Sequence, residues 1–180
     1  MLTINVPPRE MFDEATCEFI YLKGQTLQLE HSLVSIAKWE SKWHKPFLGK
    51  EPKTLEEERD YVRCMTITQN VDPLIYSGLT SDIFSQIKSY IDDPMTATWF
   101  STDKSGPVNR EIITSEIIYY WMFSFSIPKE CEKWHLNRLL TQIRVANIKN
   151  SPPQKMSNKE IYSRNKALND ARRKAMNSKG

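Results

Sequence analysis

The residues of this chain that could do chemistry are few, and their spacing does not form a complete site. Cys131 and His135 are four positions apart, which on one helix would put a thiol and an imidazole on the same face. Such a pair could supply two metal ligands, but a structural zinc site needs four. No CxxC or HExxH motif completes the set. His31 and His44 are isolated, and each is more typical of a strand-end or surface histidine than of a ligand. We therefore expect neither a metal nor a cofactor.

The acidic residues are also better explained by structure than by catalysis. The densest runs are Glu56–Glu58 and Asp92–Asp93. The first run fits the opening turn of a helix, where the helix dipole favours acids, and the second fits a helix exit. The sequence has no GxSxG motif and no glycine-rich phosphate loop, and it holds only five glycines. We therefore expect no catalytic residues and a protein that is not an enzyme.

Composition indicates a globular protein of a reducing compartment. The chain has 180 residues, of which 39% are hydrophobic and 26% charged, which is ordinary for a soluble domain. Its longest apolar run, Ile117–Phe123, is far shorter than the roughly 20 residues that cross a bilayer, and no secretion signal opens the chain. Cys17, Cys64 and Cys131 are odd in number and widely spaced, as in reduced thiols. These features predict a cytoplasmic protein without a membrane partner.

Charge divides the chain into two parts. Residues 149–180 carry nine Lys or Arg against two acids, whereas residues 1–148 carry sixteen bases against twenty acids. Such asymmetry is typical of an arm that meets an anionic partner or is ordered by a partner. We expect one globular domain over residues 1–150 and a basic C-terminal arm, helical or disordered, over residues 151–180. The pattern favours a protein that works by binding.

The elements that must position these residues are mostly helical. Two β-favouring runs, Cys17–Leu22 and Thr26–His31, predict a hairpin that turns at Lys23-Gly24-Gln25. An edge strand through Leu2, Ile4 and Val6 could precede them, before Pro7-Pro8. Apolar residues at helical spacing then predict about five helices. They run from Ser32 to Pro46, from the Thr54/Glu57 capping box toward Ile67, from Ile83 to Pro94, from an Asn109 cap to Phe125, and from Pro128 toward Pro152.

The expected fold class is mainly α with a small N-terminal β-hairpin (α+β), a helical core and a C-terminal basic helical arm. The helix from Asn109 to Phe125 is apolar on nearly all sides, which predicts a buried, central helix. The Ile127-Pro128 junction should join it to the next helix as an αα-hairpin. Most of the core is therefore expected around these two helices.

Two places are candidate partner-binding surfaces. Trp39 and Trp43 lie one helical turn apart beside several lysines, so they form either core anchors or an aromatic interface with a basic rim. In the arm, a Ser157/Glu160 capping box opens a helix on which Ile161 and Leu168 lie near one face. That helix could dock on a partner, or be a solvated tail. The arm's basic pair, Arg172 and Arg173, leaves phosphate contact with a nucleic acid as a weaker alternative.

Several stretches of the chain, spread over nearly its full length, form a recognisable set. They are Leu29–Ser35 with Lys38-Trp39-Glu40, Asp93–Thr98, Arg110–Met122, Trp134–Thr141, Ile148–Asn150, Pro152-Pro153 and Leu168–Arg173. These stretches resemble a family of proteins from long-tailed bacteriophages and prophages that are often described as tail assembly chaperones.

The resemblance implies a small, mostly helical protein of the host bacterial cytoplasm. Such a chaperone coats the long tape-measure protein while tube subunits polymerise around it, and it is absent from the finished virion. Proteins of this kind are often made in two lengths by programmed frameshifting. Other tail proteins are further candidate partners, and a homo-oligomer is compatible with the sequence. The competing classes are a structural virion component, such as a head–tail connector or tail completion protein, and a nucleic-acid-binding regulator.

Overall fold

A computed structural model of the protein describes residues 1–13, 17–100, 111–151 and 158–177. The chain divides into two compact units, Met1–Asn147 and Ile148–Gly180. The first unit carries the strands and its own hydrophobic core. The second contains the helix α6, Asn158–Ala175.

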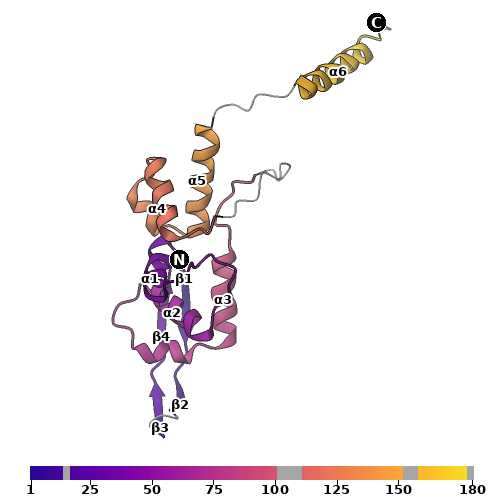
Figure 1. Ribbon diagram of the computed structural model, residues 1–180. Coiled ribbons are helices and arrows are strands. Elements are labelled where there is room, and N and C mark those ends of the chain that lie inside the picture. Colours follow the sequence, from indigo (N-terminus) through magenta and orange to yellow (C-terminus); the bar gives the residue numbers. More distant parts are fainter. Residues whose placement is uncertain (14–16, 101–110, 152–157, 178–180) are drawn as a thin grey trace. The chain divides into compact units, whose positions relative to one another are not determined.

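The first unit opens with a two-stranded antiparallel ribbon that is interrupted in its middle (Figure 1). Its strands are β1 (Leu2–Val6), β2 (Arg9–Asp13), β3 (Glu18–Leu22) and β4 (Gln25–Leu29). β1 pairs with β4, with Val6 opposite Gln25, and β2 pairs with β3, with Arg9 opposite Leu22. The edge strand expected through Leu2, Ile4 and Val6 is confirmed as β1.

The predicted pairing of Cys17–Leu22 with Thr26–His31 is wrong. The two runs do form β3 and β4, but they follow one another along the same side of the ribbon. Lys23 and Gly24 face Pro7-Pro8 of the other side, where proline has no N–H to donate and breaks the ladder. The local turn signal at Lys23-Gly24-Gln25 therefore marks the interruption between the two paired segments of a long antiparallel ribbon.

The other regular elements of the described chain are helices. In chain order, the helices between the ribbon and α6 are α1 (Leu33–Trp43), α2 (Leu55–Met65), the 3₁₀ helix η1 (Pro73–Gly78), α3 (Ser81–Asp92), α4 (Ser115–Ser124), the 3₁₀ helix η2 (Lys129–Lys133) and α5 (Leu136–Asn150). The prediction of a mainly helical α+β protein with a small N-terminal β-hairpin is confirmed. Across the described ranges, no helix has both the length and the apolar character that a membrane crossing requires.

Local capping fixes the starts of the first two helices, and the sequence predicts the second of these caps. The Thr54 hydroxyl accepts from the backbone N–H of Glu57, and the Glu57 carboxylate accepts from the backbone N–H of Thr54 at 2.7 Å. Ser32 and Ser35 make the same reciprocal pair at the start of α1. Each box satisfies two N–H groups that a helix start leaves without a partner.

The core is organised around α1, which contacts α2, α4 and η2. Leu33, Ile36 and Trp39 of this helix are at most 1% exposed. β1 and β4 add the buried side chains of Ile4, Val6, Leu27 and Leu29, and α3 packs against β1. The core is therefore centred on an N-terminal helix and not on the segment from Asn109 to Phe125.

That segment differs from the prediction in two ways. The helix α4 begins at Ser115, and the expected cap Asn109 lies outside the described residues. Ile118 and Met122 are buried, but Tyr120 and Phe123 are 68% and 66% exposed. The all-round apolar pattern thus combines a core-facing stripe with an apolar outer face, so α4 is peripheral.

The helix predicted to start at Pro128 is split. Pro128 leads into η2, the backbone becomes extended at Trp134, and α5 starts at Leu136. A bridge between Ser32 and His135 and the 2.8 Å hydrogen bond from Leu136 N to His31 O hold this break. These long-range contacts override the local helical pattern, so Cys131 and His135 do not share the face of one helix.

Candidate partner-binding site

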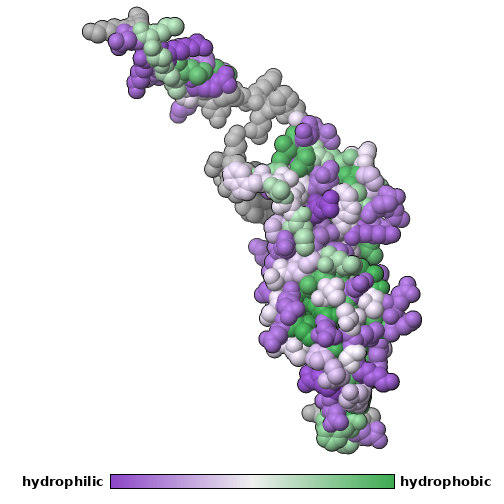
Figure 2. Space-filling view, turned by 180° about the vertical axis from the view of Figure 1, so that it is seen from behind, coloured by the Kyte–Doolittle hydropathy of each residue, from purple (hydrophilic) through white to green (hydrophobic). Residues whose placement is uncertain are grey.

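The pair β2 and β3 carries aromatic side chains on one exposed face. Phe12 lies opposite Phe19, and their rings meet edge to face with centroids 5.2 Å apart. Tyr21 is two residues further along β3 and so points to the same side. Phe12, Phe19 and Tyr21 are 53%, 75% and 62% exposed. We call these three residues of β2 and β3 the arm face; the name refers to this pair of strands and not to the C-terminal basic arm. Figure 2 shows hydrophobic surface at this end of the first unit.

The opposite side of the same two strands is also apolar. Met11 lies opposite Ile20, and both are half-buried. A two-stranded hairpin alone is marginally stable in water. Exposed aromatic rings on such an element leave unfavourable contact with water that a bound partner would remove. The arm face is therefore the strongest candidate for a contact surface in the first unit.

Two close contacts fix the base of the β2–β3 pair, where it continues into β1 and β4. A Cβ on Gly24 would lie 2.7 Å from Pro8 Cδ and 2.9 Å from Val6 O, so the strands approach too closely there for a side chain. Next to it, Leu22 is buried and packs against Gly78 of η1. The direction of the β2–β3 pair is thus set by the close approach of the two backbones at Gly24 and by the core packing of Leu22.

A second exposed aromatic surface lies on α4. Tyr120 and Phe123 are three positions apart, so they project from neighbouring places on one side of the helix. Beside them, Tyr119 is half-buried and its hydroxyl donates to Glu132 at 2.9 Å. Tyr120 and Phe123, which we call the α4 face, form the second candidate.

The sequence-based candidate Trp39/Trp43 does not form a surface of this kind. Trp39 is 1% exposed, and its indole Nε1 donates to Glu57 O at 2.9 Å inside the core. Trp43 is half-buried, stacks on Trp39 with centroids 6.2 Å apart, and donates to Asp60 Oδ2 at 2.9 Å. The hypothesis that this pair forms an interface is therefore wrong, because Trp39 is a core residue. The error arose because α-helical spacing alone does not distinguish a stripe that faces the core from one that faces a partner.

The candidates in the C-terminal unit lie on α6. Ile161 and Leu168 are 39% and 48% exposed, and Arg172 and Arg173 are exposed near the end of the helix. The predicted Ser157 cap lies outside the described residues. The helix thus offers an apolar stripe and a basic end.

A buried polar cluster occupies the place where chemistry could be sought. The His31 and His135 rings lie edge to face with centroids 5.1 Å apart. His31 Nδ1 is hydrogen-bonded to the Tyr61 hydroxyl at 2.5 Å, and His135 Nε2 lies 3.0 Å from Tyr90 O. Both histidines are at most 6% exposed, so His31, which lies just after β4, is a core residue and not a surface histidine. Each ring has a structural partner.

The electrostatics of the cluster indicate a neutral, structural role. Burial, with a smaller contribution from the charge of His135, lowers the pKa of His31 from 6.5 to about 3. Burial also raises the pKa of Tyr61 far above its usual value. The half-buried thiol of Cys64 has its pKa raised to about 11, again mainly by burial. A thiol that stays protonated at neutral pH is a poor nucleophile.

No group of three or more His, Cys, Asp or Glu side chains suited to a metal ion occurs within the described ranges. The pair Cys131 and His135 is separated by the end of η2, and His135 is engaged by Tyr90 O and by Asn137 N. The isolated His44 is exposed and ends α1 in a left-handed conformation. Exposed apolar and basic side chains are the candidates for contact with a partner in this part of the chain.

Sequence reasoning missed the arm face and the α4 face. Side chains alternate between the two faces of a strand, so Phe19 and Tyr21 share one face of β3 while Ile20 and Leu22 share the other. The presence of two aromatic residues on one face was the signal that could have predicted the arm face. Comparison of the chain with protein-family models, with curated proteins and with solved structures gave no match.

Proposed function

We propose that the protein is a tail assembly chaperone of a long-tailed bacteriophage, which binds the tape-measure protein in the host cytoplasm and keeps it soluble while the tail tube polymerises. It acts by protein–protein binding without catalysis. The resemblance described above suggests this role, and the arm face is the structural observation that supports it most directly.

The arm face suits a helical, apolar target. Its three aromatic rings present a rigid apolar surface with little side-chain entropy to lose, which makes aromatic residues effective in contacts. A tape-measure protein is expected to be a very long helix with apolar stripes, and such stripes dock on exposed apolar faces. The Phe12/Phe19 pair would take one such stripe.

Weak contacts are sufficient in this role. Many copies bound along one long target gain in avidity what each contact lacks in affinity. Weak contacts can also be displaced when tube subunits arrive. The small area of the arm face therefore agrees with the proposed function better than with a permanent complex, which buries a larger surface.

Co-expression with the tape-measure candidate encoded in the same genome tests the proposal. We expect the wild-type chain to keep that protein soluble and to co-purify with it in many copies. The double variant Phe12→Ser with Phe19→Ser should fold but lose co-purification, because it removes the apolar contact. Tyr162→Ser on α6 is a matched control, since Tyr162 is an exposed aromatic residue on the other unit. An insoluble target in the presence of wild-type chain contradicts the proposal.

A structural virion component is the alternative that the exposed apolar faces also suit. Purified particles decide between the two, because a chaperone is absent from them and a connector or completion protein is present.

The exposed Arg172 and Arg173 give a nucleic-acid regulator some support as well. That role requires DNA or RNA affinity that falls steeply with salt and disappears when residues 149–180 are deleted.

A further inference from the structure

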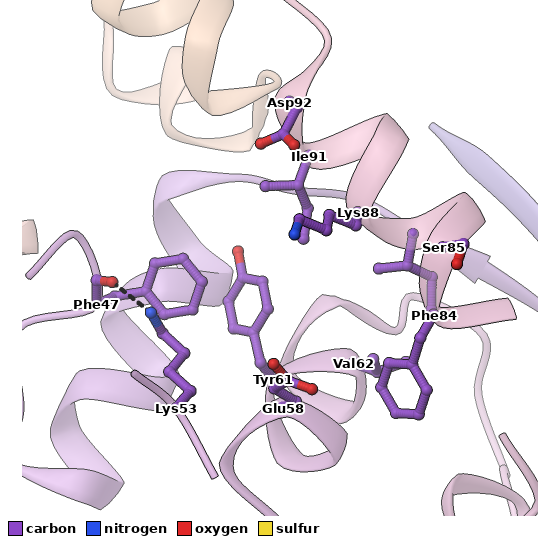
Figure 3. Close-up of a pocket in the computed structure, with 11 residues that line it drawn as sticks. Phe47, Lys53, Glu58, Tyr61, Val62, Phe84, Ser85, Lys88, Ile91 and Asp92 are labelled. Carbon is purple, nitrogen blue, oxygen red and sulfur yellow. Dashed lines mark hydrogen bonds between the residues drawn. The ribbon is translucent and has the colours of Figure 1, made fainter. Parts of the chain in front are cut away.

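A cavity of about 370 Å³ lies in the first unit between α2, α3 and the segment that precedes α2 (Figure 3). This volume is within the range of roughly 300–1,000 Å³ that is typical of ligand sites. Most of its wall is apolar. The apolar lining residues are Phe47, Tyr61, Val62, Phe84, Ile87 and Ile91.

Lys53 places a cation in this apolar wall. Its side chain is half-buried, its Nζ donates to Phe47 O at 2.8 Å, and it lies 4.3 Å from the centroid of the Phe47 ring. No ion pair of Lys53 occurs among the described residues. Burial lowers the pKa of this amine, although the charges of Glu57 and Glu58 oppose the shift. An ammonium group has three N–H donors, so Lys53 can donate further hydrogen bonds.

The buried carboxylate whose charge acts on Lys53 is engaged elsewhere. Glu57 Oε1 is 2.6 Å from Lys45 Nζ, and its Oε2 accepts from Thr54 N at 2.7 Å. Glu57 therefore holds the start of α2 and does not neutralise Lys53 by contact. A half-buried ammonium without a contacting carboxylate has an electrostatic incentive to bind an anion.

A second cation reaches the same space from α3. Figure 3 shows Lys53 and Lys88 extending toward the cavity from opposite sides, with the Tyr61 ring between them. The acids of the lining, Glu58 and Asp92, are both exposed. The apolar wall on the α3 side includes Phe84. The cavity thus combines two amines that point inward with an apolar surface that can hold a compact hydrocarbon group.

We propose that this cavity binds a carboxylate joined to an apolar group, with the carboxylate at Lys53 and Lys88 and the apolar group against Phe84 and Ile87. The inference stands apart from the proposed chaperone function, because it uses neither the arm face nor the α4 face. The same chemistry has two sources. One is a free monocarboxylic acid, and the other is an acidic side chain next to an apolar one in a peptide.

Paired probes separate charge from shape. The full-length protein is titrated with 3-phenylpropanoate and with 3-phenylpropanamide, which have the same size but differ in charge, while side-chain methyl signals of Val62, Ile87 and Ile91 are followed by NMR. The acetylated, amidated peptides Ala-Leu-Phe-Glu-Ala and Ala-Leu-Phe-Gln-Ala form the second pair. In at least one pair we expect the acid to bind about tenfold more tightly, the effect of one charge-assisted hydrogen bond.

Lysine variants assign the preference to the cavity. Lys53→Met keeps a long apolar side chain and should reduce the preference for the acid to about twofold or less. Lys88→Met lies on an exposed helix position and keeps the test valid if Lys53→Met unfolds. Lys129→Met, on η2 and outside the cavity, is the matched control and should leave binding unchanged.

The pattern of outcomes identifies the source. Preference within the phenylpropanoate pair indicates a free acid, and preference only within the peptide pair indicates a protein segment. Equal binding of acid and neutral partner in both pairs, absence of binding by both acids, or shifts confined to methyl groups outside the cavity would overturn the inference. Failure of the tape-measure experiment would leave these results unaffected.

Discussion

The Glu40 carboxylate accepts a hydrogen bond from the backbone N–H of Ser115, 2.8 Å away and 75 residues later in the chain. Ser115 is the first residue of α4, and the preceding Thr114 makes no side-chain cap to that helix. The other carboxylate oxygen of Glu40 accepts from Phe47 N at 2.7 Å. One buried side chain of α1 therefore caps a distant helix and anchors a loop.

Glu40→Gln should destabilise the protein while leaving its shape nearly unchanged. A glutamine side chain has one acceptor oxygen and one NH₂ donor, so either Phe47 N–H or Ser115 N–H would face another donor. Loss of one buried charge-assisted hydrogen bond costs about 1.5–3 kcal/mol. Chemical denaturation measures this cost. Glu56→Gln, at an exposed position in the first turn of α2, loses only the helix-dipole contribution and should change the free energy of unfolding by less than about 1 kcal/mol. An equal effect of both variants would refute the capping role.

Gly24→Ala should destabilise the ribbon because the new Cβ would meet backbone atoms. Its neighbours would be Pro8 N at 2.8 Å and Val6 O at 2.9 Å, which cannot move aside as a side-chain end can. Overpacking of this kind costs about 1–3 kcal/mol. Thermal unfolding followed by circular dichroism tests it. Gly49→Ala is the comparison, since its closest contact would be 3.0 Å in a loop that can adjust; a larger loss for Gly49→Ala would count against this explanation.

Substitutions on the exposed side of α4 should affect stability much less than substitutions on its buried side. Tyr120→Ser and Phe123→Ser remove exposed rings, so each should change the free energy of unfolding by no more than about 0.5 kcal/mol. Ile118→Ala and Met122→Ala empty core positions and should each cost about 2–5 kcal/mol. Chemical denaturation of the four variants is the measurement. A large loss of stability in Tyr120→Ser or Phe123→Ser would contradict the peripheral position of α4 and favour the central, buried helix that the sequence pattern indicates.

The sequence predicted those features that are decided within a few residues. The Thr54/Glu57 capping box and the apolar stripe of α1 depend on neighbours along the chain, and both were predicted correctly. The fold class follows from them, because most of the chain shows helical spacing. The β1 strand was also predicted, since Pro7-Pro8 marks where it must end.

The errors concern contacts between residues far apart in sequence. Whether Lys23-Gly24 is a turn or an interruption depends on what faces it, and Pro8 comes from the other side of the ribbon. The break before α5 depends on Ser32, which bridges His135 from a hundred residues away. For the candidate site, the apolar character of Trp39 was evident, but its burial is decided by the packing of α1 against α2.

His31 makes stability depend on pH in a defined window. Its pKa is about 3 in the folded protein, first because the ring is buried and then because of the charge of His135, whereas an unfolded chain has the ordinary value of about 6.5. The folded pKa is the lower one, so below pH 6.5 the unfolded state binds more protons. The free energy of unfolding should therefore be fully retained above pH 6.5 and fall at lower pH by up to about 1.4 kcal/mol per unit, until about pH 3.

Denaturation between pH 7 and pH 5 isolates this effect, because carboxylates with ordinary pKa values titrate mostly below that range. His31→Gln keeps a group that can hydrogen-bond to Tyr61 but has no proton to gain, so its stability should vary less with pH than that of the wild type. His44→Gln removes an exposed histidine and should leave the wild-type slope unchanged. The same slope in His31→Gln and wild type would mean that a group other than His31 controls the pH dependence.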